Sequence, residues 1–165
     1  MTADASSVPP DARPVADIHE LLALAELVGV RHYEVAGRRS LEAEGRPESI
    51  EAAEQDVVLS VRRHEDELEI RFRMVVVTPD ADLVADVSVV YALPSHFDVS
   101  RPLTEEFVER VAVMAAFPFL RESIFTTATR LGATASVLGL LRAGQFKVGP
   151  APDGEEPVEE ANTDP

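Results

Sequence analysis

Cysteine is absent from this 165-residue chain, and basic residues are scarce. Without cysteine there can be no disulfide, no thiolate zinc site and no cysteine nucleophile. Lys and Arg together number 15 against 30 Asp and Glu, which gives a formal net charge of −15 at pH 7. Phosphate recognition needs clustered Lys and Arg, so this balance argues against nucleic acid as a partner.

Long hydrophobic runs are also missing. No stretch reaches the roughly 18 uncharged apolar residues of a membrane span, and Met1–Pro10 contains no apolar signal-peptide run. The sequence therefore predicts a cytoplasmic protein without direct membrane insertion. Apolar residues nevertheless make up 45% of the chain, which is enough to build the hydrophobic core of one domain.

Motifs for catalysis, metal binding and phosphate binding are missing as well. No Gly-rich phosphate loop, HExxH or GxSxG segment is present. The adjacent acids Glu105/Glu106 and Glu155/Glu156 are expected in solvated places, which would not raise the pKa of one carboxyl as glycoside hydrolysis requires. We therefore predict no enzyme activity and no cofactor. We also predict no metal site, because the four histidines belong to different predicted elements: His19, His32, His64 and His96.

Both ends of the chain have the composition of disordered segments. Residues 1–14 contain three prolines and two adjacent serines, which predicts a disordered lead-in. Residues 149–165 hold four prolines, six acids and no basic residue, which predicts an acidic disordered tail that either solubilises the protein or recruits a partner. The folded domain is then expected over residues 15–148.

Hydrophobic periodicity divides this domain into helices and strands. A helical period over Ala16–Val28 is followed by Gly29, a favourable residue at the end of a helix. Alternating apolar and polar residues then predict four strands separated by short turns, over residues 30–37, 57–62, 68–76 and 83–91. Such turns indicate an antiparallel meander with one apolar face.

Helical spacing returns after the fourth strand. Thr104 is expected to cap a helix that must kink or restart at Pro118, because proline lacks the amide hydrogen that would bond Met114. A second helix is expected over residues 119–131, ended by Gly132. The order of elements predicts an α+β fold, in which a four-stranded antiparallel sheet carries a short N-terminal helix and a kinked pair of C-terminal helices.

The segment VAVMAAFPFLRESIFTTATRL, residues 111–131, resembles the SecB family of export chaperones. In that family an apolar helix leads into Phe-Pro-aromatic-x-Arg-Glu and then into a long amphipathic helix. The strand over residues 83–93 is similar to the family's last strand, including Asp86 on the face opposite the apolar set. The resemblance covers residues 30–146, and the residues that match its central motif are Phe117, Pro118, Phe119, Arg121 and Glu122.

The resemblance implies an ATP-independent holding chaperone that binds unfolded polypeptides in long apolar grooves. It implies a homotetramer built as a dimer of dimers, and it implies Asp86 as a docking residue for a receiving partner such as the SecA translocase motor. For the helix residues, hydrophobic core or oligomer interface is the alternative role. The residues implied for client binding are Tyr91, Phe117, Phe119, Leu120 and Ile124.

Departures from the family pattern leave the client open. The proline-rich loop that follows the long helix in the family has no counterpart in residues 133–137. Of the family's acidic SecA-docking residues on the sheet, only Asp86 has a match. The helix ahead of the sheet is more similar to SecB-like chaperones that partner toxin–antitoxin systems. The client is therefore either a preprotein destined for export or an antitoxin.

Two other functions compete with this interpretation. A curved antiparallel sheet under a long helix can enclose an apolar cavity, as in a small protein that binds a hydrophobic ligand. A thioester-type enzyme on a similar layout would need a carboxylate or histidine on the long helix facing the sheet, and Glu122 beside Arg121 is the candidate. Otherwise we expect these two residues to form a structural ion pair that anchors the long helix.

Overall fold

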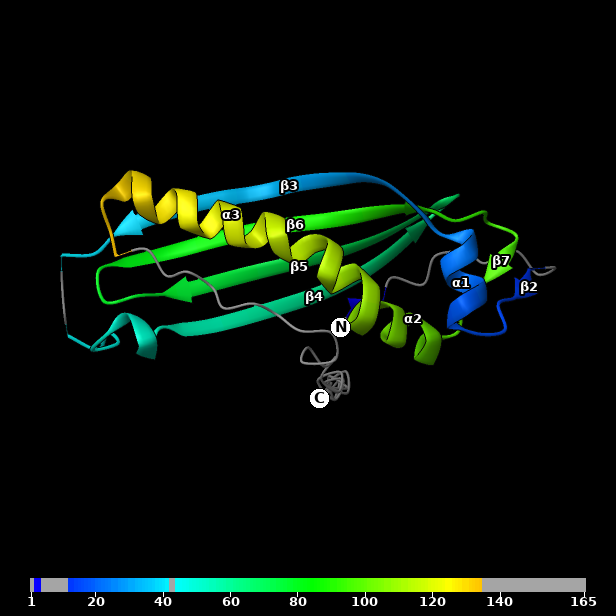
Figure 1. The fold of residues 1–165 in the computed structure, drawn as a ribbon, viewed down its shortest axis with the longest axis horizontal. Helices are drawn as coiled ribbons and strands as arrows, with labels where there is room; N and C mark the ends of the chain where they lie inside the picture. Colours follow the sequence, from blue (N-terminus) through cyan, green and yellow to red (C-terminus); the bar gives the residue numbers. More distant parts are fainter. Residues whose placement is uncertain (1, 4–11, 42–43, 135–165) are drawn as a thin grey trace, which may run out of the picture.

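The computed structural model describes residues 2–3, 12–41 and 44–134 of the chain (Figure 1). Its centre is an antiparallel sheet of four long strands: β3 (Glu26–Arg39), β4 (Glu54–His64), β5 (Glu67–Val77) and β6 (Ala81–Ala92). A short helix, α1 (Ile18–Leu24), precedes the sheet, and a 3₁₀ turn (Ile50–Ala52) lies ahead of β4. A long helical segment follows the strands and covers one face of the sheet. The predicted α+β fold is confirmed.

The order of the strands differs from the predicted meander. Strands β4, β5 and β6 follow one another as hairpins, but β3 pairs with β6, so the order across the sheet is β4-β5-β6-β3. The chain therefore passes from one edge of the sheet to the other between β3 and β4, which is a Greek-key order. The meander was wrong because the long connection over residues 40–53 can lead to either edge, and only the pairing with β6 selects one.

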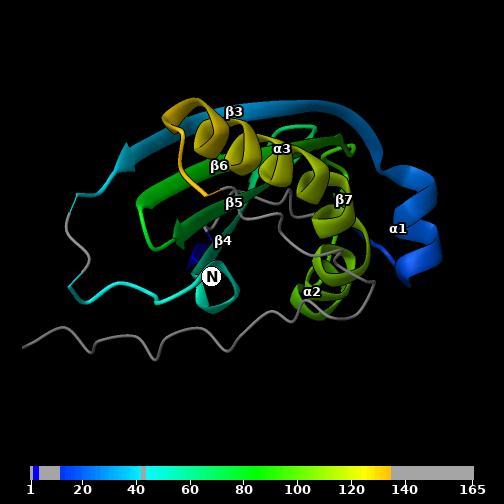
Figure 2. The same cartoon turned by 60° about the vertical axis from the view of Figure 1, so that its left-hand side comes forward.

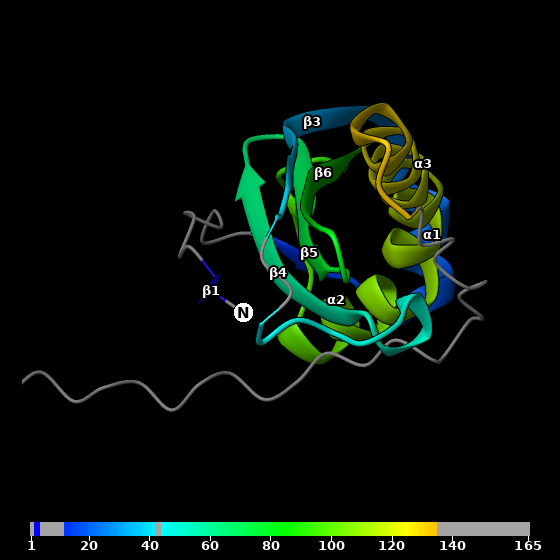
Figure 3. The same ribbon diagram turned by 90° about the vertical axis from the view of Figure 1, so that its left-hand side faces the viewer.

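One face of the sheet is apolar, as the alternation predicted. The helix α3 (Val113–Leu131) lies chiefly over β6 and β3 on this face, and Figure 3 shows the sheet on one side with α2 and α3 opposite it. Each aliphatic or aromatic side chain fully buried there stabilises the fold by about 1.5–3 kcal/mol before ordering costs. The largest side chains sealed between the two layers are Ile70, Phe72, Val76, Leu83, Val87, Val89, Leu120 and Ile124.

Helix and sheet approach most closely at Gly37. A Cβ atom on this residue would lie 2.5 Å from Cγ2 of Thr127 and 2.8 Å from Cδ1 of Leu131. Only a residue without a side chain lets α3 reach β3 at this point. The prediction placed Gly37 at the end of its strand, whereas β3 continues to Arg39.

The first helix is shorter than predicted and the first strand is longer. Asp17 caps α1 by accepting hydrogen bonds from the amides of the first turn. Leu27 and Val28, which the helical period placed in the helix, belong to β3. Gly29 does not end the helix but lies within the strand after a register shift. Ladder hydrogen bonds to β6 therefore outweigh a helical period that extends over the junction.

The C-terminal helical pair joins at a different place than predicted. A first helix, α2 (Arg101–Phe107), passes through a π-helical segment, η2 (Val108–Ala112), directly into α3. Pro118 lies inside α3, so its missing amide hydrogen does not interrupt the helix. The departure from α-helical bonding occurs about two to three turns earlier, in η2. Such π segments are rare and are found frequently at functional sites.

The helical segment begins at a different residue than predicted and ends at the predicted one. Ser100, not Thr104, precedes the first turn, and the Thr104 hydroxyl donates to the Ser100 carbonyl over 3.1 Å inside the helix. Gly132 ends α3 in the left-handed conformation with φ of 61°, as predicted. By length and composition the segment Arg101–Leu131 could cross a membrane. This is weak evidence for a membrane span, because core helices meet the same criterion.

Short pairings at the ends of the molecule involve the predicted lead-in over residues 1–14. Strand β1 (Thr2–Ala3) lies parallel to β4, and β2 (Arg13–Pro14) lies parallel to β7 (Phe97–Asp98). Figure 2 shows α1, α2 and β7 gathered at one end of the sheet. The predicted acidic tail over residues 149–165 and the last apolar patch, Val137–Leu141, lie outside the described residues.

Candidate functional site

The two phenylalanines around Pro118 lie on opposite flanks of α3, because two residues turn a helix by about 200°. Phe119 is 39% exposed, and its ring meets the ring of His32 on β3 edge to face, with centroids 6.2 Å apart. Phe117 is half-buried against the hydrophobic core. The motif therefore supplies one aromatic side chain to each side of the helix.

Along the flank between α3 and β3, apolar side chains remain accessible. A regular strand would send residues 32 and 35 to opposite faces of the sheet. A register shift between His32 and Glu34 changes this, so that His32 faces Val87 and Val35 faces Ala85, both on the inner, helix-covered face. Val35 is 48% exposed there. Val35, Phe119 and the ring of His32 form a strip of aliphatic and aromatic side chains, which we call the β3 flank.

The opposite flank lies between α3 and β4. The inner side of β4 presents a row of half-buried residues, Val57, Leu59 and Val61, which pack against the edge of the core. On the same side of the helix as Phe117, Met114 is 38% exposed and Phe125 is 43% exposed. We call this strip the β4 flank. Accessible apolar side chains thus occur on both sides of α3.

Leu120 and Ile124, two of the residues implied for client binding, lie between these flanks. They point straight at the sheet and are 1% and 0% exposed. In this conformation they belong to the core, and their role in client binding stays a prediction. The burial follows from their spacing, since residues four apart lie one above the other on the same face of the helix.

Tyr91 lies deeper than a groove residue would. It is on the inner side of β6 and 4% exposed, and its ring meets Phe107 edge to face with centroids 5.0 Å apart. Its hydroxyl has no hydrogen-bond partner among the described residues. Burial raises the pKa of Tyr91 to about 12. Its role in client binding also stays a prediction.

Arg121 and Glu122 do not form the expected ion pair within the described part of the chain. Glu122 is exposed, and its Oε1 accepts a hydrogen bond from the Thr126 hydroxyl over 2.9 Å. The prediction was wrong because neighbouring helix residues point about 100° apart. Glu122 also faces solvent and not the sheet, so it does not meet the requirement for a thioester-type enzyme.

Asp86 is held on the outer face of the sheet by Arg71. The guanidinium donates from Nε to Oδ1 over 2.6 Å and from Nη2 to Oδ2 over 2.7 Å, and Asp86 is 1% exposed. The Arg71 guanidinium also stacks on the ring of Tyr33, 4.1 Å from its centroid. Docking of a partner at Asp86 stays a prediction, and it would require the partner to displace this arginine.

Other charges of the outer face are paired in the same way. Glu69 accepts hydrogen bonds from the Ser88 hydroxyl over 2.6 Å and from the Tyr33 hydroxyl over 2.7 Å. Burial alone would raise the pKa of Glu69, but these two bonds and nearby Arg31 bring it below its ordinary value. A hollow of about 240 Å³ beside it is lined by charged or titratable side chains, which do not favour an apolar ligand: Arg31, Arg62, His64, Glu67 and Glu69.

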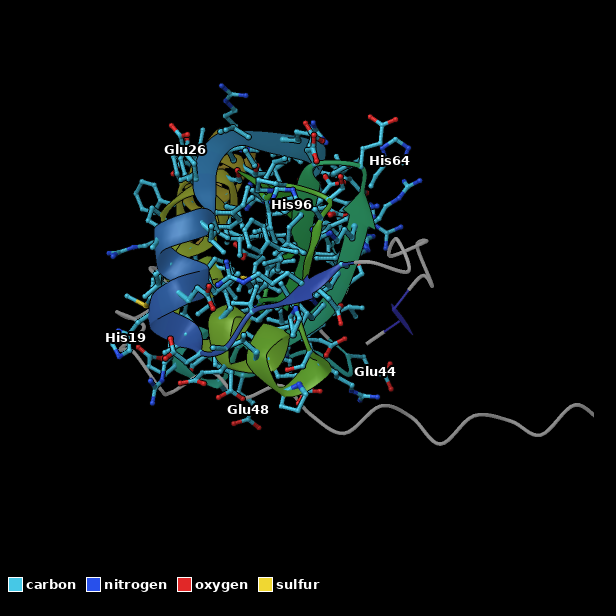
Figure 4. The ribbon with its side chains drawn as sticks, turned by 90° about the vertical axis from the view of Figure 1, so that its right-hand side faces the viewer. His19, Glu26, Glu44, Glu48, His64 and His96 are labelled. Atoms are coloured by element: carbon cyan, nitrogen blue, oxygen red, sulfur yellow. The ribbon has the colours of Figure 1, made fainter. Side chains whose placement is uncertain are left out.

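Histidines of the chain lie apart in the structure. Figure 4 shows His19, His64 and His96 at separate places. Among the described residues, no group of three His, Asp or Glu side chains could hold a metal ion.

No family model matches the chain. The chain is 34% identical over 142 residues to the SecB-like chaperone SmegB of Mycolicibacterium smegmatis, and the match covers 85% of this chain and 91% of SmegB. Among solved structures, the fold is similar to the Mycobacterium tuberculosis Rv1957 SecB-like chaperone in complex with a ChAD peptide from the Rv1956 HigA1 antitoxin. That similarity has a TM-score of 0.63 at 13% identity, over 75% of this chain and 92% of the other.

Proposed function

Because this chain belongs to the SecB-like chaperone family, as its Phe-Pro-Phe segment predicted, we propose that it is an ATP-independent holding chaperone for non-native polypeptides. The observation that supports this most is the accessible apolar surface along both flanks of α3. Phe119, Phe125 and Met114 on the helix and Val35 on β3 are each more than a third exposed. Apolar side chains that gather along a groove or flank are typical of sites that bind another polypeptide.

The energetics favour extended apolar clients held at several places. Each client side chain removed from water contributes about 1.5–3 kcal/mol before ordering costs, so one flank alone holds a segment weakly. Two flanks on each subunit of an oligomer would hold one long client at several points, which raises the overall affinity without new kinds of contact. The net charge of −15 keeps such an adhesive assembly in solution.

We propose a homotetramer in the cytoplasm as the working form. Strand β3 is the outermost long strand on its side of the sheet, so a second copy can pair along it. Leu27 and Val28 at the start of this strand are 47% and 54% exposed, which is apolar surface that such pairing would cover. Mass measurement in solution tests the tetramer directly.

The client class follows from the same chemistry. A ChAD peptide from an antitoxin occupies the M. tuberculosis chaperone of the same fold, which supports an antitoxin segment as client here. A preprotein segment with apolar side chains would suit the same flanks, and delivery to the export machinery is the second possibility. SecA as the receiving partner is less well supported, because the matching acid, Asp86, is bound to Arg71.

The test is suppression of aggregation by the purified chain, without nucleotide, when a chemically denatured model protein is diluted into buffer. We expect Phe119→Asp to weaken suppression, because a charge would then lie in the β3 flank. Thr129→Asp, on the exposed side of α3, is the matched control and should leave suppression unchanged. A wild-type protein that is monomeric, has no effect on aggregation and carries a stoichiometric lipid would instead be a small hydrophobic-ligand-binding protein.

A further inference from the structure

Tyr91 combines two properties that do not belong together in a purely structural residue. Its side chain is sealed inside an apolar cluster at the α1 and α2 end of the sheet, and its hydroxyl oxygen has no hydrogen-bond partner among the described residues. Buried polar atoms in native proteins are nearly always paired, and each exception calls for an explanation. Phenylalanine would fill the same space without this penalty.

The cover over Tyr91 is lightly attached. The ring of Phe107, at the end of α2, lies edge to face on the tyrosine ring at 5.0 Å. The seven-residue helix α2 buries only Leu103 and Phe107, and its neighbour α1 buries only Leu21. No side chain caps the first turn of α2. Elements with few buried side chains open at low free-energy cost.

A hinge for such an opening is built into the helix. The π-helical segment η2 begins directly after Phe107 and separates α2 from the firmly packed α3. Within η2, Val108 and Ala112 are fully buried, so this segment can stay in place while α2 moves. The opened end would lie beside α1 and β7, where α3 begins (Figure 2), so a client segment bound along the flanks could reach it.

We propose that α2 is a hinged cover, and that a bound client displaces it and receives a hydrogen bond from the Tyr91 hydroxyl at a main-chain carbonyl. This inference rests on the proposed function, which it extends by a specific residue. A tyrosine hydroxyl is a good donor to a carbonyl, and every polypeptide offers carbonyls whatever its sequence. The contact would therefore suit a chaperone that accepts many clients, while the apolar flanks select for hydrophobic segments.

The chain offers a matched pair of tyrosines for the test. Tyr91→Phe removes an unpaired buried hydroxyl, whereas Tyr33→Phe removes one that is paired with Glu69 on the outer face. Thermal unfolding and binding of a labelled, carboxymethylated, permanently unfolded protein are measured on the full-length chain. We expect Tyr91→Phe to raise the melting temperature by about 2–4 °C and to raise the Kd about three- to tenfold. Tyr33→Phe should leave the Kd unchanged and the melting temperature equal or slightly lower.

Two results would overturn the inference. Unchanged client affinity in Tyr91→Phe would leave the hydroxyl without a role in binding, and a lower melting temperature would mean that it has a structural partner. Amide hydrogen exchange tests the hinge separately: residues 101–107 should exchange faster when the unfolded probe is bound, and equal or slower exchange contradicts an opening. If the wild-type chain fails to bind the probe at all, the proposed function fails, not the role of Tyr91 alone.

Discussion

At the scale of single residues, Asp86 shows how one arginine changes the use of a carboxylate. Its two oxygens are bound by Arg71 and almost fully shielded from solvent. An isolated carboxylate in this position would be costly, and the bidentate arginine offsets that cost. The residue that the resemblance marked for partner docking is thus first of all part of the sheet's own structure.

This pairing predicts unequal effects for two conservative substitutions on the outer face. Asp86→Asn should lower the free energy of unfolding by about 2 kcal/mol, because it removes a shielded, charge-assisted pair. Glu34→Gln removes the ion pair with Arg73. Because the Glu34 side chain is 44% exposed, the free energy of unfolding should fall by less than about 1 kcal/mol. Urea unfolding of both variants measures the difference. Equal values would mean that Asp86 is not shielded as described.

Asp82, near the start of β6, pairs with Arg46 and makes stability depend on pH. The hydrogen bond from Arg46 lowers the pKa of Asp82 below its ordinary value of 3.8, although burial acts in the opposite direction. A carboxyl with a lowered pKa in the folded state stabilises the fold above its ordinary pKa. That contribution is lost as the pH falls below 3.8 toward the folded-state value.

We therefore expect Asp82→Asn to be less stable than the wild type at neutral pH, with the gap closing as the pH falls below about 4. Arg46→Gln should reproduce only part of the pH dependence, since Arg38 still donates a hydrogen bond to Asp82. Chemical denaturation at a series of pH values is the measurement. A gap that stays constant between neutral and acidic pH would contradict the role of the pair.

At the scale of elements, the contact between α3 and β3 depends on Gly37. Gly37→Ala should lower the free energy of unfolding by about 1–3 kcal/mol, because the added methyl group would overlap Thr127 and Leu131. Gly29→Ala is the control in the same strand, since nothing lies within 4 Å of its Cβ position. Denaturation curves of the two variants should separate clearly, and a neutral Gly37→Ala would show that the helix can move away freely.

The long helix also contains a residue that should weaken it. Pro118 is exposed inside α3 and supplies no amide hydrogen to the helix. Pro118→Ala should therefore raise the free energy of unfolding by about 1–3 kcal/mol, which thermal or chemical unfolding can detect. A loss of stability would mean that the proline ring itself makes a contact that the helix needs.

At the scale of the whole molecule, the two edges of the sheet are expected to behave differently. Val28 on β3 and Val58 on β4 are 54% and 57% exposed, so they are matched in residue type and accessibility. If copies pair along β3, Val28→Lys should reduce the mass in solution, because a charge would enter the interface. Val58→Lys should leave the mass unchanged. Equal behaviour of the two variants would contradict assembly through β3.

Apolar contacts and charged contacts on the surface should respond differently to salt. Several accessible apolar side chains lie along the flanks of α3 and on β3, and others are Leu22 on α1, Leu41, and Val58 on β4. The side of the sheet away from α3 carries paired charges such as Arg31–Glu67 and Arg73–Glu34. Raising the ionic strength screens the paired face far more than the apolar flanks. The affinity for a client bound through the flanks should therefore change less with salt than the affinity for a partner bound on the charged face.

Several features of the fold, and the family, were determined by the sequence alone. The α+β fold, the apolar faces of β5 and β6 and the end of α3 at Gly132 follow from local properties: a period of two or of 3.6 residues and a glycine that adopts positive φ. The segment over residues 111–131, together with the strands ahead of it, predicted the family, because a proline within an apolar helix next to an Arg-Glu pair is an uncommon combination.

Only the tertiary structure decided the rest. The order of the strands depends on which edge β3 joins, and a long connection does not reveal this. The rotation of α3 about its axis, set by packing at Gly37 and along β6, made Phe119 accessible and sealed Leu120. The shielding of Asp86 depends on an arginine from the neighbouring strand. Each of these outcomes is a contact between residues distant in the chain, and local periodicity carries no information about such contacts.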